Sequence, residues 1–242
     1  GEGTAEDVRL RYRYLDLRRP AMLLNLRRRH QAVRGAREHL DSLGFVEIET
    51  PVLGRAYGGA AARPFVTSST ALDADLYLRV SPECNLKQAL CGGLHKVFEI
   101  GKNFRNEGID HSHNPEFTAL EWYEAWSDYQ HQMERFETLV ARLSKVVSQN
   151  CVVHFRGRDI DFTPPWPRQR VTDLVAEEIG VAPDLLSTDV MAQHWTGHCL
   201  PIPMPTSWGQ LVMAIFEKLI EPSLIGPTFI IDHPTDGSPL TK

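Results

Sequence analysis

Long apolar runs and clustered cysteines are both scarce in this sequence of 242 residues. No run of about 18 apolar residues occurs, so a membrane-spanning helix is not expected. No secretory signal precedes the first expected element. The four cysteines form no CxxC pair and no pattern typical of a disulfide framework. We therefore expect reduced thiols in a cytoplasmic protein.

Metal-ligating patterns are also sparse. His194 and His198 lie four residues apart and Cys199 follows, which is a spacing that can present metal ligands on a helix. No second pair of ligands is evident in the sequence. The favoured interpretation is therefore two ordinary polar histidines near a loop, with the metal site as the alternative.

Lysine is absent from the first 40 residues, which nevertheless carry ten arginines against five acids, a charge of +5. The whole chain has a net charge of −5, which leaves −10 on the remainder (−5 minus +5). A basic end on an acidic protein can guide a nucleic acid. It can equally be the solvated face of a helix with internal ion pairs, and charge alone favours this second interpretation.

Helical and strand patterns alternate along the chain. Apolar spacing predicts a helix over 20–43, and alternation then predicts a strand over 45–50. Further strands are expected at 76–80, 97–106, 116–125 and 228–231, a hairpin at 152–162, and helices at 85–90, 128–148, 171–179 and 208–220. Residues 180–207 are expected to be irregular. Long hairpins interleaved with helices predict an α+β fold, in which an antiparallel β-sheet is flanked by helices.

The segments 97–106 and 116–125 are predicted to pair as an antiparallel hairpin. Because successive side chains of a strand point to opposite faces, one face would gather Arg105 and Glu107 with Phe117, Glu121 and Tyr123. The loop between the strands adds His111, His113 and Asn114.

That face has the chemistry to bind a nucleotide. Arg105 can neutralise a phosphate with two parallel hydrogen bonds, and Phe117 offers a flat surface for a base. His113 and Glu107 supply polar groups near the phosphates or the base edge. Glu121 is then left as a carboxylate that requires a cation. The alternative is a solvated hairpin with cross-strand ion pairs.

Several stretches resemble one known family. FRNEGIDHSHNPEFTALEWYEAWSDY (104–129) resembles motif 2 of the class II aminoacyl-tRNA synthetases of the lysyl type, and LGFVEIETPVL (Leu43–Leu53) resembles motif 1. RYRYLDLRRP (11–20) resembles the linker between the anticodon-binding and catalytic domains of the aspartyl and lysyl subgroup. GGAAARPF (58–65), LYLRVSPE (76–83) and IGPTFIIDHPTDGSPL (225–240) also resemble lysyl members. The resemblance covers nearly the whole chain.

The amino-acid pocket separates the lysyl from the aspartyl type. A bound aspartate needs a cationic partner, whereas the ammonium of lysine needs anions, and two carboxylates that converge on it make a buried charge acceptable. The resemblance implies that Glu83, Glu121 and Tyr123 hold the lysine side chain. It also implies that Gly58 and Gly59 let the backbone approach the substrate closely.

The resemblance implies ATP and Mg²⁺ as cofactors. Arg105 would bind the α-phosphate and act as the catalytic residue, and Glu107, His113, Asn114 and Phe117 would help to hold ATP. In the family, the magnesium ligands and the glycine-rich motif 3 follow the position of Lys242, so no metal ligand is expected in this chain. The simplest account is a fragment of a longer enzyme.

The implied domain organisation has two parts. Residues 1–19 would be a linker from an upstream anticodon-binding domain that this chain lacks. Residues 20–242 would be an incomplete catalytic domain, less regular at about 150–207. Implied partners are lysine, ATP, tRNA and a second copy of the chain, which would bind through Leu43–Leu53.

Two other functions remain open. Some lysyl-type paralogues attach a lysine-like residue to a translation factor, and the segment ALEWYE is similar to them. A truncated paralogue that dimerises without catalysis is the third possibility. Asp110, His111 and Ser112 are unusual in the motif 2 loop, and the sequence assigns them no role.

Overall fold

The computed structural model describes residues 3–110, 112–198 and 203–237 and consists of two compact units, 1–132 and 133–242. The boundary falls within helix α5 (Tyr129–Ser148), inside the region that the sequence treats as one domain. That domain assignment therefore stays a prediction. Among the described residues, no helix is both long and apolar enough to cross a membrane. His111 and Cys199, two residues singled out in the sequence, lie outside the described ranges.

The first unit begins with three helices: α1 (Glu6–Arg11), α2 (Arg13–Asp16) and α3 (Pro20–Ser42). The Asp16 side chain is 1% exposed and binds Arg9 at 3.0 Å, Arg13 at 2.6 Å and Arg19 at 3.2 Å. The hydrogen bond from Arg9, helped by Arg19, lowers the pKa of this carboxyl group. Three of the N-terminal arginines thus form internal ion pairs.

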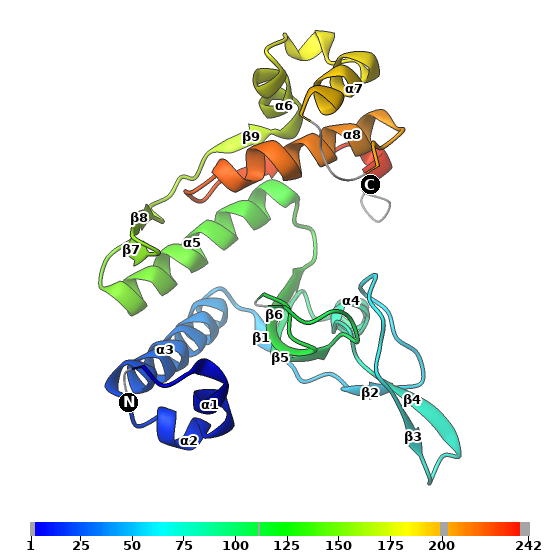
Figure 1. Ribbon diagram of the computed structural model, residues 1–242. Coiled ribbons are helices and arrows are strands. Elements are labelled where there is room, and N and C mark those ends of the chain that lie inside the picture. Colours follow the sequence, from blue (N-terminus) through cyan, green and yellow to red (C-terminus); the bar gives the residue numbers. More distant parts are fainter. Residues whose placement is uncertain (1–2, 111, 199–202, 238–242) are drawn as a thin grey trace. The chain divides into compact units, whose positions relative to one another are not determined.

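A three-stranded sheet occupies the centre of the first unit, in the order β1-β5-β6 (Figure 1). Its strands are β1 (Val46–Glu47), β5 (Lys96–Phe104) and β6 (Glu116–Glu124). The predicted antiparallel hairpin is confirmed as β5 and β6, whereas β1 runs parallel to β5 and is shorter than expected. The last ladder bond runs from the Ile48 N–H to Phe98 O, and Thr50 then donates from its backbone and hydroxyl to Glu99 Oε2, at 3.2 and 2.7 Å.

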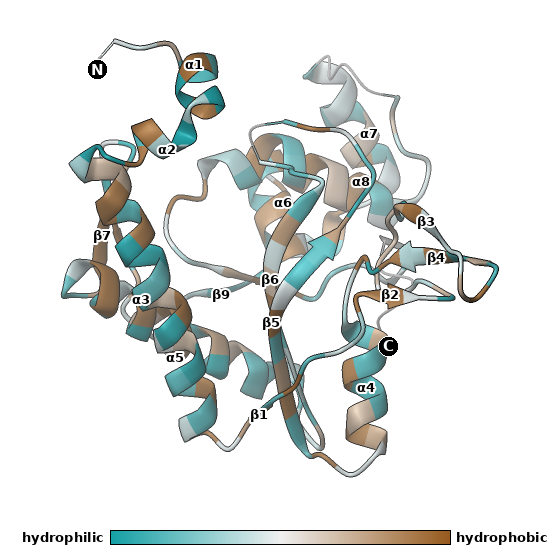
Figure 2. Ribbon diagram, turned by 90° about the horizontal axis from the view of Figure 1, so that it is seen from below, coloured by the Kyte–Doolittle hydropathy of each residue, from teal (hydrophilic) through white to brown (hydrophobic). Residues whose placement is uncertain are grey.

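One face of this sheet is closed by a hydrophobic core. Phe98 of β5 packs with Leu40 of α3 and with Phe45, and all three are buried. Leu120 and Trp122 of β6 join the same cluster. Figure 2 shows hydrophobic residues interspersed with hydrophilic ones along α3, as expected for a helix with one buried face. The opposite face of the hairpin is therefore the one available for polar chemistry.

A second, smaller antiparallel sheet precedes the hairpin, in the order β2-β4-β3. Its strands are β2 (Leu53–Gly54), β3 (Val66–Ser69) and β4 (Ala74–Leu78), and helix α4 (Glu83–Cys91) follows. The predicted strand at 76–80 and helix at 85–90 are confirmed, each with a start two residues earlier than expected.

The second unit combines one long helix with short strands and helices. They are the remainder of α5, β7 (Val152–Phe155), β8 (Arg158–Asp161), β9 (Arg168–Arg170), α6 (Val171–Ile179), α7 (Thr188–Gly197), α8 (Trp208–Ile215) and β10 (Phe229–Ile231). Short helical turns lie at Pro183–Leu185, Phe216–Ile220, Glu221–Ser223 and Thr235–Gly237. The predicted hairpin is confirmed as β7 and β8, and β10 pairs in parallel with β9.

The expectation of an irregular segment at 180–207 is wrong for α7, and the wider region at about 150–207 is more regular than expected. Ser187 accepts a hydrogen bond from the backbone N–H of Val190 and so caps the helix. Met191 and Trp195 lie four residues apart and are 0% and 4% exposed. These two apolar positions fix α7 on the core of the unit, although Gln193 and His194 between them are polar.

Candidate functional site

The open face of the β5–β6 hairpin carries the polar residues that the alternation predicts. Tyr123, Glu121 and Phe117 of β6 lie opposite Val97, Glu99 and Asn103 of β5. Arg105 follows the last residue of β5, and its backbone N–H donates to Pro115 O at 2.9 Å. The predicted sorting of side chains between the two faces is thereby confirmed along the paired strands.

Glu121 is the centre of a small hydrogen-bonded group, which we call the carboxylate cluster (Ser81, Glu83, Glu121 and Tyr123). Ser81 Oγ donates to the Glu121 carboxylate at 3.1 and 3.2 Å, and Tyr123 OH donates to Glu121 Oε2 at 3.2 Å. The backbone N–H of Glu83 donates to Ser81 Oγ at 3.1 Å. Burial, followed by the charges of Glu121 and Glu83, raises the pKa of Tyr123. The cluster thus places two carboxylates around one neutral phenol.

Gly58 and Gly59 lie against the start of α4, beside this cluster. Gly59 has φ +85°, and a Cβ there would lie 2.9 Å from Glu83 Cβ and 3.1 Å from Ser81 Oγ. A Cβ at Gly58 would lie 3.5 Å from Cys84 Sγ. Only glycine fits at position 59, because a side chain would meet both a strained backbone and a filled space.

The carboxylate cluster already accepts an ammonium from the chain itself. Lys87 Nζ lies 2.5 Å from Glu83 Oε1, one helical turn along α4, and 5.9 Å from the centre of the Tyr123 ring. Its side chain is 56% exposed, so solvent screens this pair. The carboxylate cluster therefore has the negative charge and the aromatic surface that bind a primary amine.

At the loop end of the hairpin lies a cavity of about 230 Å³, which we call the loop cavity. Its lining comprises Arg105, Glu107, Gly108, Ser112, His113, Asn114 and Phe117. All five residues that the resemblance assigns to ATP are among them. Arg105 Cζ lies 5.2 Å from the centre of the Phe117 ring, and Arg105 Nε is buried without a hydrogen-bond partner among the described residues.

Asp110 organises this loop, a role that the sequence did not assign. Its Oδ1 accepts from the backbone N–H groups of Ser112 at 2.6 Å and His113 at 2.8 Å. Its Oδ2 lies 2.8 Å from His113 Nδ1. These hydrogen bonds, that of Ser112 first, lower the pKa of Asp110. The Asp110 carboxylate thus orients the His113 ring. Separately, Glu107 Oε1 accepts a hydrogen bond from the Arg63 backbone N–H at 3.3 Å.

A buried polar layer under the open face was also missed by the sequence analysis. Arg79 Nη1 pairs with Glu99 Oε1 at 2.5 Å, with side chains 7% and 6% exposed, and donates to Thr50 Oγ1 at 2.8 Å. A Cβ at Gly101 would collide with this pair. Asn103 is 1% exposed, and its Oδ1 has no hydrogen-bond partner among the described residues. The signal was present in the alternation of Glu99, Gly101 and Asn103 along β5.

A family model described as "tRNA synthetases class II (D, K and N)" matches residues 5–242. The chain belongs to this family. The resemblance of motifs 1 and 2 to class II synthetases and the predicted α+β fold are thereby confirmed.

The chain is similar to curated lysine–tRNA ligases. It is 43% identical to that of Clostridium botulinum (strain Langeland) over 246 residues, which cover 98% of this chain and 48% of the relative. It is 44% identical to that of Clostridium perfringens (strain 13) over 241 residues, with the same coverage of 98% and 48%. The lysine–tRNA ligase of Pelotomaculum thermopropionicum is 43% identical over 242 residues, which again cover 98% of this chain and 48% of the relative. The chain thus spans about half the length of these class II relatives.

Proposed function

We propose that this chain forms the lysine- and ATP-binding surface of a lysine–tRNA ligase. The observation that carries the proposal is the shared face of β6, on which Glu121 and Tyr123 lie four and six residues beyond Phe117. The names of the relatives, all lysine–tRNA ligases, support the choice of amino acid and of tRNA as the acceptor. Activity in the cytoplasm is part of the same proposal.

The carboxylate cluster would hold the lysine side chain. Glu121 keeps lone pairs available beyond its bonds to Ser81 and Tyr123, and a carboxylate pair offsets the cost of removing an ammonium from water. The substrate ammonium would meet Glu121 directly and would compete with Lys87 for Glu83. Gly58 and Gly59 would leave room for the α-amino end of lysine.

The loop cavity would hold ATP. Phe117 would stack on the base, Arg105 would bind the α-phosphate, and Glu107, His113 and Asn114 would contact the rest of the nucleotide. The unpartnered Nε of Arg105 fits this role, since a phosphate oxygen would satisfy it. Four residues of strand separate Phe117 from Glu121, a distance of about 13 Å. That span suits one elongated ligand with an aromatic end and a cationic end.

The reaction would proceed in two steps without a protein nucleophile. A carboxylate oxygen of lysine attacks the α-phosphorus of ATP, and the bond from that phosphorus to the bridging oxygen breaks to release pyrophosphate. The lysyl group then passes to a terminal hydroxyl of tRNA, and AMP leaves. Arg105 would stabilise the negative charge that develops at the α-phosphate, and the two pockets would align the reactants.

Magnesium is the expected counterion of the ATP phosphates, whose charge it neutralises. We assign it no protein ligand among the described residues, because the family resemblance implies that its ligands lie outside this segment. Among the residues that line the loop cavity, Arg105 is the cationic side chain that would face the phosphates.

We also propose that the chain dimerises through Leu43–Leu53. Val46, Val52 and Leu53 are 46%, 38% and 48% exposed in this segment, which is a high apolar exposure for so short a stretch. Residues 1–19, with α1 and α2, would serve as the linker that the family resemblance assigns to them.

Lysine-dependent exchange of pyrophosphate into ATP tests the proposed activation step. The protein should support exchange with lysine and not with aspartate or asparagine, the substrates of the other two branches of the family. Exchange with aspartate instead of lysine would contradict the assignment of the carboxylate cluster. Charging of lysine tRNA then tests whether tRNA is the acceptor. Transfer of the lysyl group to a protein, without any charging of tRNA, would show that the acceptor is a protein.

A further inference from the structure

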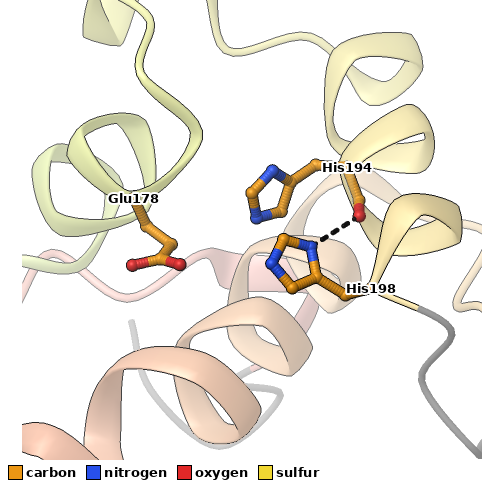
Figure 3. A group of neighbouring side chains, drawn as sticks. All are labelled: Glu178, His194 and His198. Carbon is orange, nitrogen blue, oxygen red and sulfur yellow. Dashed lines mark hydrogen bonds between the residues drawn. The ribbon is translucent and has the colours of Figure 1, made fainter.

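Three side chains of metal-ligand type meet in the second unit, apart from the hairpin face. Glu178 lies on α6, His194 lies on α7, and His198 follows the last residue of α7 (Figure 3). One potential ligand atom of each lies within 4.8 Å of those of the other two. We call this group the His–Glu cluster.

The two histidines present the same kind of ring atom to Glu178. They lie four residues apart, and their ring centres are 4.2 Å apart. His198 Nδ1 lies 3.0 Å from the His194 carbonyl oxygen. Because a carbonyl only accepts, Nδ1 carries the proton, and Nε2 of His198 is left with a free lone pair. Figure 3 shows the free ring nitrogen of His198 and one of the two ring nitrogens of His194 on the side of Glu178.

The buried Nε2 atom of His194 favours the presence of a bound metal ion. Its Nε2 is buried and has no hydrogen-bond partner among the described residues. Buried polar atoms are rarely left without a partner in folded proteins, because the lost hydration is not replaced. A metal ion would satisfy this atom, and the bond from His198 Nδ1 to a carbonyl is the outer contact that orients metal-bound imidazoles.

The helices that carry the cluster are fixed by the core of the unit. Val175 of α6 and Met191 and Trp195 of α7 belong to one buried hydrophobic cluster. The backbones of α6 and α7 are therefore held together whether or not a ligand is present. Glu178 is exposed, so its carboxylate is accessible to an ion from solvent.

We propose that Glu178, His194 and His198 bind a zinc ion that links α6 to α7. Two imidazoles and one carboxylate suit Zn²⁺, with water as the fourth ligand of a tetrahedral site, whereas Mg²⁺ favours an all-oxygen set. The bond lengths of about 2.0–2.2 Å that zinc requires are reached by rotation of the side chains. The sequence favoured ordinary histidines because Glu178 lies 16 and 20 residues before them and its proximity was not visible.

Zinc titration against a chromophoric chelator tests this proposal on the intact chain. The unsubstituted chain should bind one Zn²⁺, and His194→Ala and Glu178→Gln should each weaken binding by about tenfold or more. Glu177→Gln is the matched control, since Glu177 is the exposed acid next to Glu178 on α6. His154→Ala, in the β7–β8 hairpin, controls for the loss of any exposed histidine.

A second readout separates a built site from an adventitious one. Zinc should raise the thermal unfolding temperature of the unsubstituted chain and of both controls, and a chelator should reverse the shift. At the same zinc concentration the shift should be clearly smaller in Glu178→Gln than in Glu177→Gln, because the weaker site is less occupied. Glu178→Gln is a surface change that leaves the core intact, so it tests the proposal even if His194→Ala fails to fold. Absence of stoichiometric binding, or equal affinity in Glu178→Gln and Glu177→Gln, would overturn the proposal.

Discussion

The two ends of the β5–β6 hairpin differ in how they hold their polar groups. The carboxylate cluster is built on strand β6 and the start of α4, and its groups are buried or half-buried and bonded to one another. The loop cavity is built mainly on the connection between the strands, where His113 and Glu107 are exposed and a single carboxylate, Asp110, orders the backbone. The first end is preorganised by regular structure and the second by local hydrogen bonds.

This difference predicts unequal sensitivity to substitution. Changes in the strand-built end should act on lysine, and changes in the loop-built end should act on ATP. Arg105, at the junction of strand and loop, should affect the chemical step itself.

Arg105→Ala is expected to have the largest effect. Loss of the guanidinium removes the charge that would stabilise the α-phosphate in the transition state, at a cost of about 3–4 kcal/mol, or roughly 10²–10³-fold in rate. Arg105→Lys should restore only part of the activity, because an ammonium lacks the two parallel donors. Lysine-dependent ATP–pyrophosphate exchange is the measurement, and a rate within threefold of the unsubstituted protein would refute the role.

Gly59→Ala should have the next largest effect, confined to lysine. The new Cβ would meet Glu83 Cβ at 2.9 Å, in addition to a backbone strain of roughly 1–2 kcal/mol from the positive φ. Gly157→Ala is the matched control: Gly157 has φ +79° and no atom within 4 Å of the added Cβ. Both variants should lose stability in thermal unfolding because of the positive φ, Gly59→Ala the more so because of its added contact, and only Gly59→Ala should weaken lysine binding. Equal lysine affinity in the two would contradict the proposed approach of substrate at Gly59.

Asp110→Asn should have the smallest effect, confined to ATP. The amide oxygen can still accept from the backbone N–H groups of Ser112 and His113, but the negative charge and the second acceptor oxygen beside His113 Nδ1 are lost. ATP should therefore bind about three- to tenfold more weakly. Asp161→Asn is the control, since Asp161 orders a turn through Thr163 in the second unit. Calorimetric titration with ATP and with lysine distinguishes the two ligands, and an equal loss for both would remove the division between the ends.

The strand-built end could be predicted from the sequence because its geometry follows from a period of two residues. Glu121 and Tyr123 share a face with Phe117 in any antiparallel hairpin, and the pairing with β5 fixes their neighbours. Ser81 could not be found in this way, since it reaches Glu121 across 40 residues of sequence.

The loop-built end could be predicted only through the family resemblance. Nothing in the spacing of Asp110 shows that it accepts three hydrogen bonds, because these depend on the conformation of the loop. The proximity of Glu178 to the two histidines could not be predicted for a related reason, because Glu178 belongs to a different helix. Helix α7 itself was missed because only Met191 and Trp195 mark its buried side.

The central claim is that one face of β6 binds one ligand with two chemically different ends. Its most direct test is calorimetric binding of lysine, ATP and a non-hydrolysable lysyl-adenylate analogue to Glu121→Gln and Phe117→Ala, with Glu116→Gln on the opposite face as the control. Glu121→Gln should weaken the binding of lysine and of the analogue by about 10–100-fold. Phe117→Ala should weaken the binding of ATP and of the analogue by about 1–3 kcal/mol. The control should leave the affinity for all three ligands unchanged. An analogue whose affinity responds to only one of the two substitutions would contradict the account.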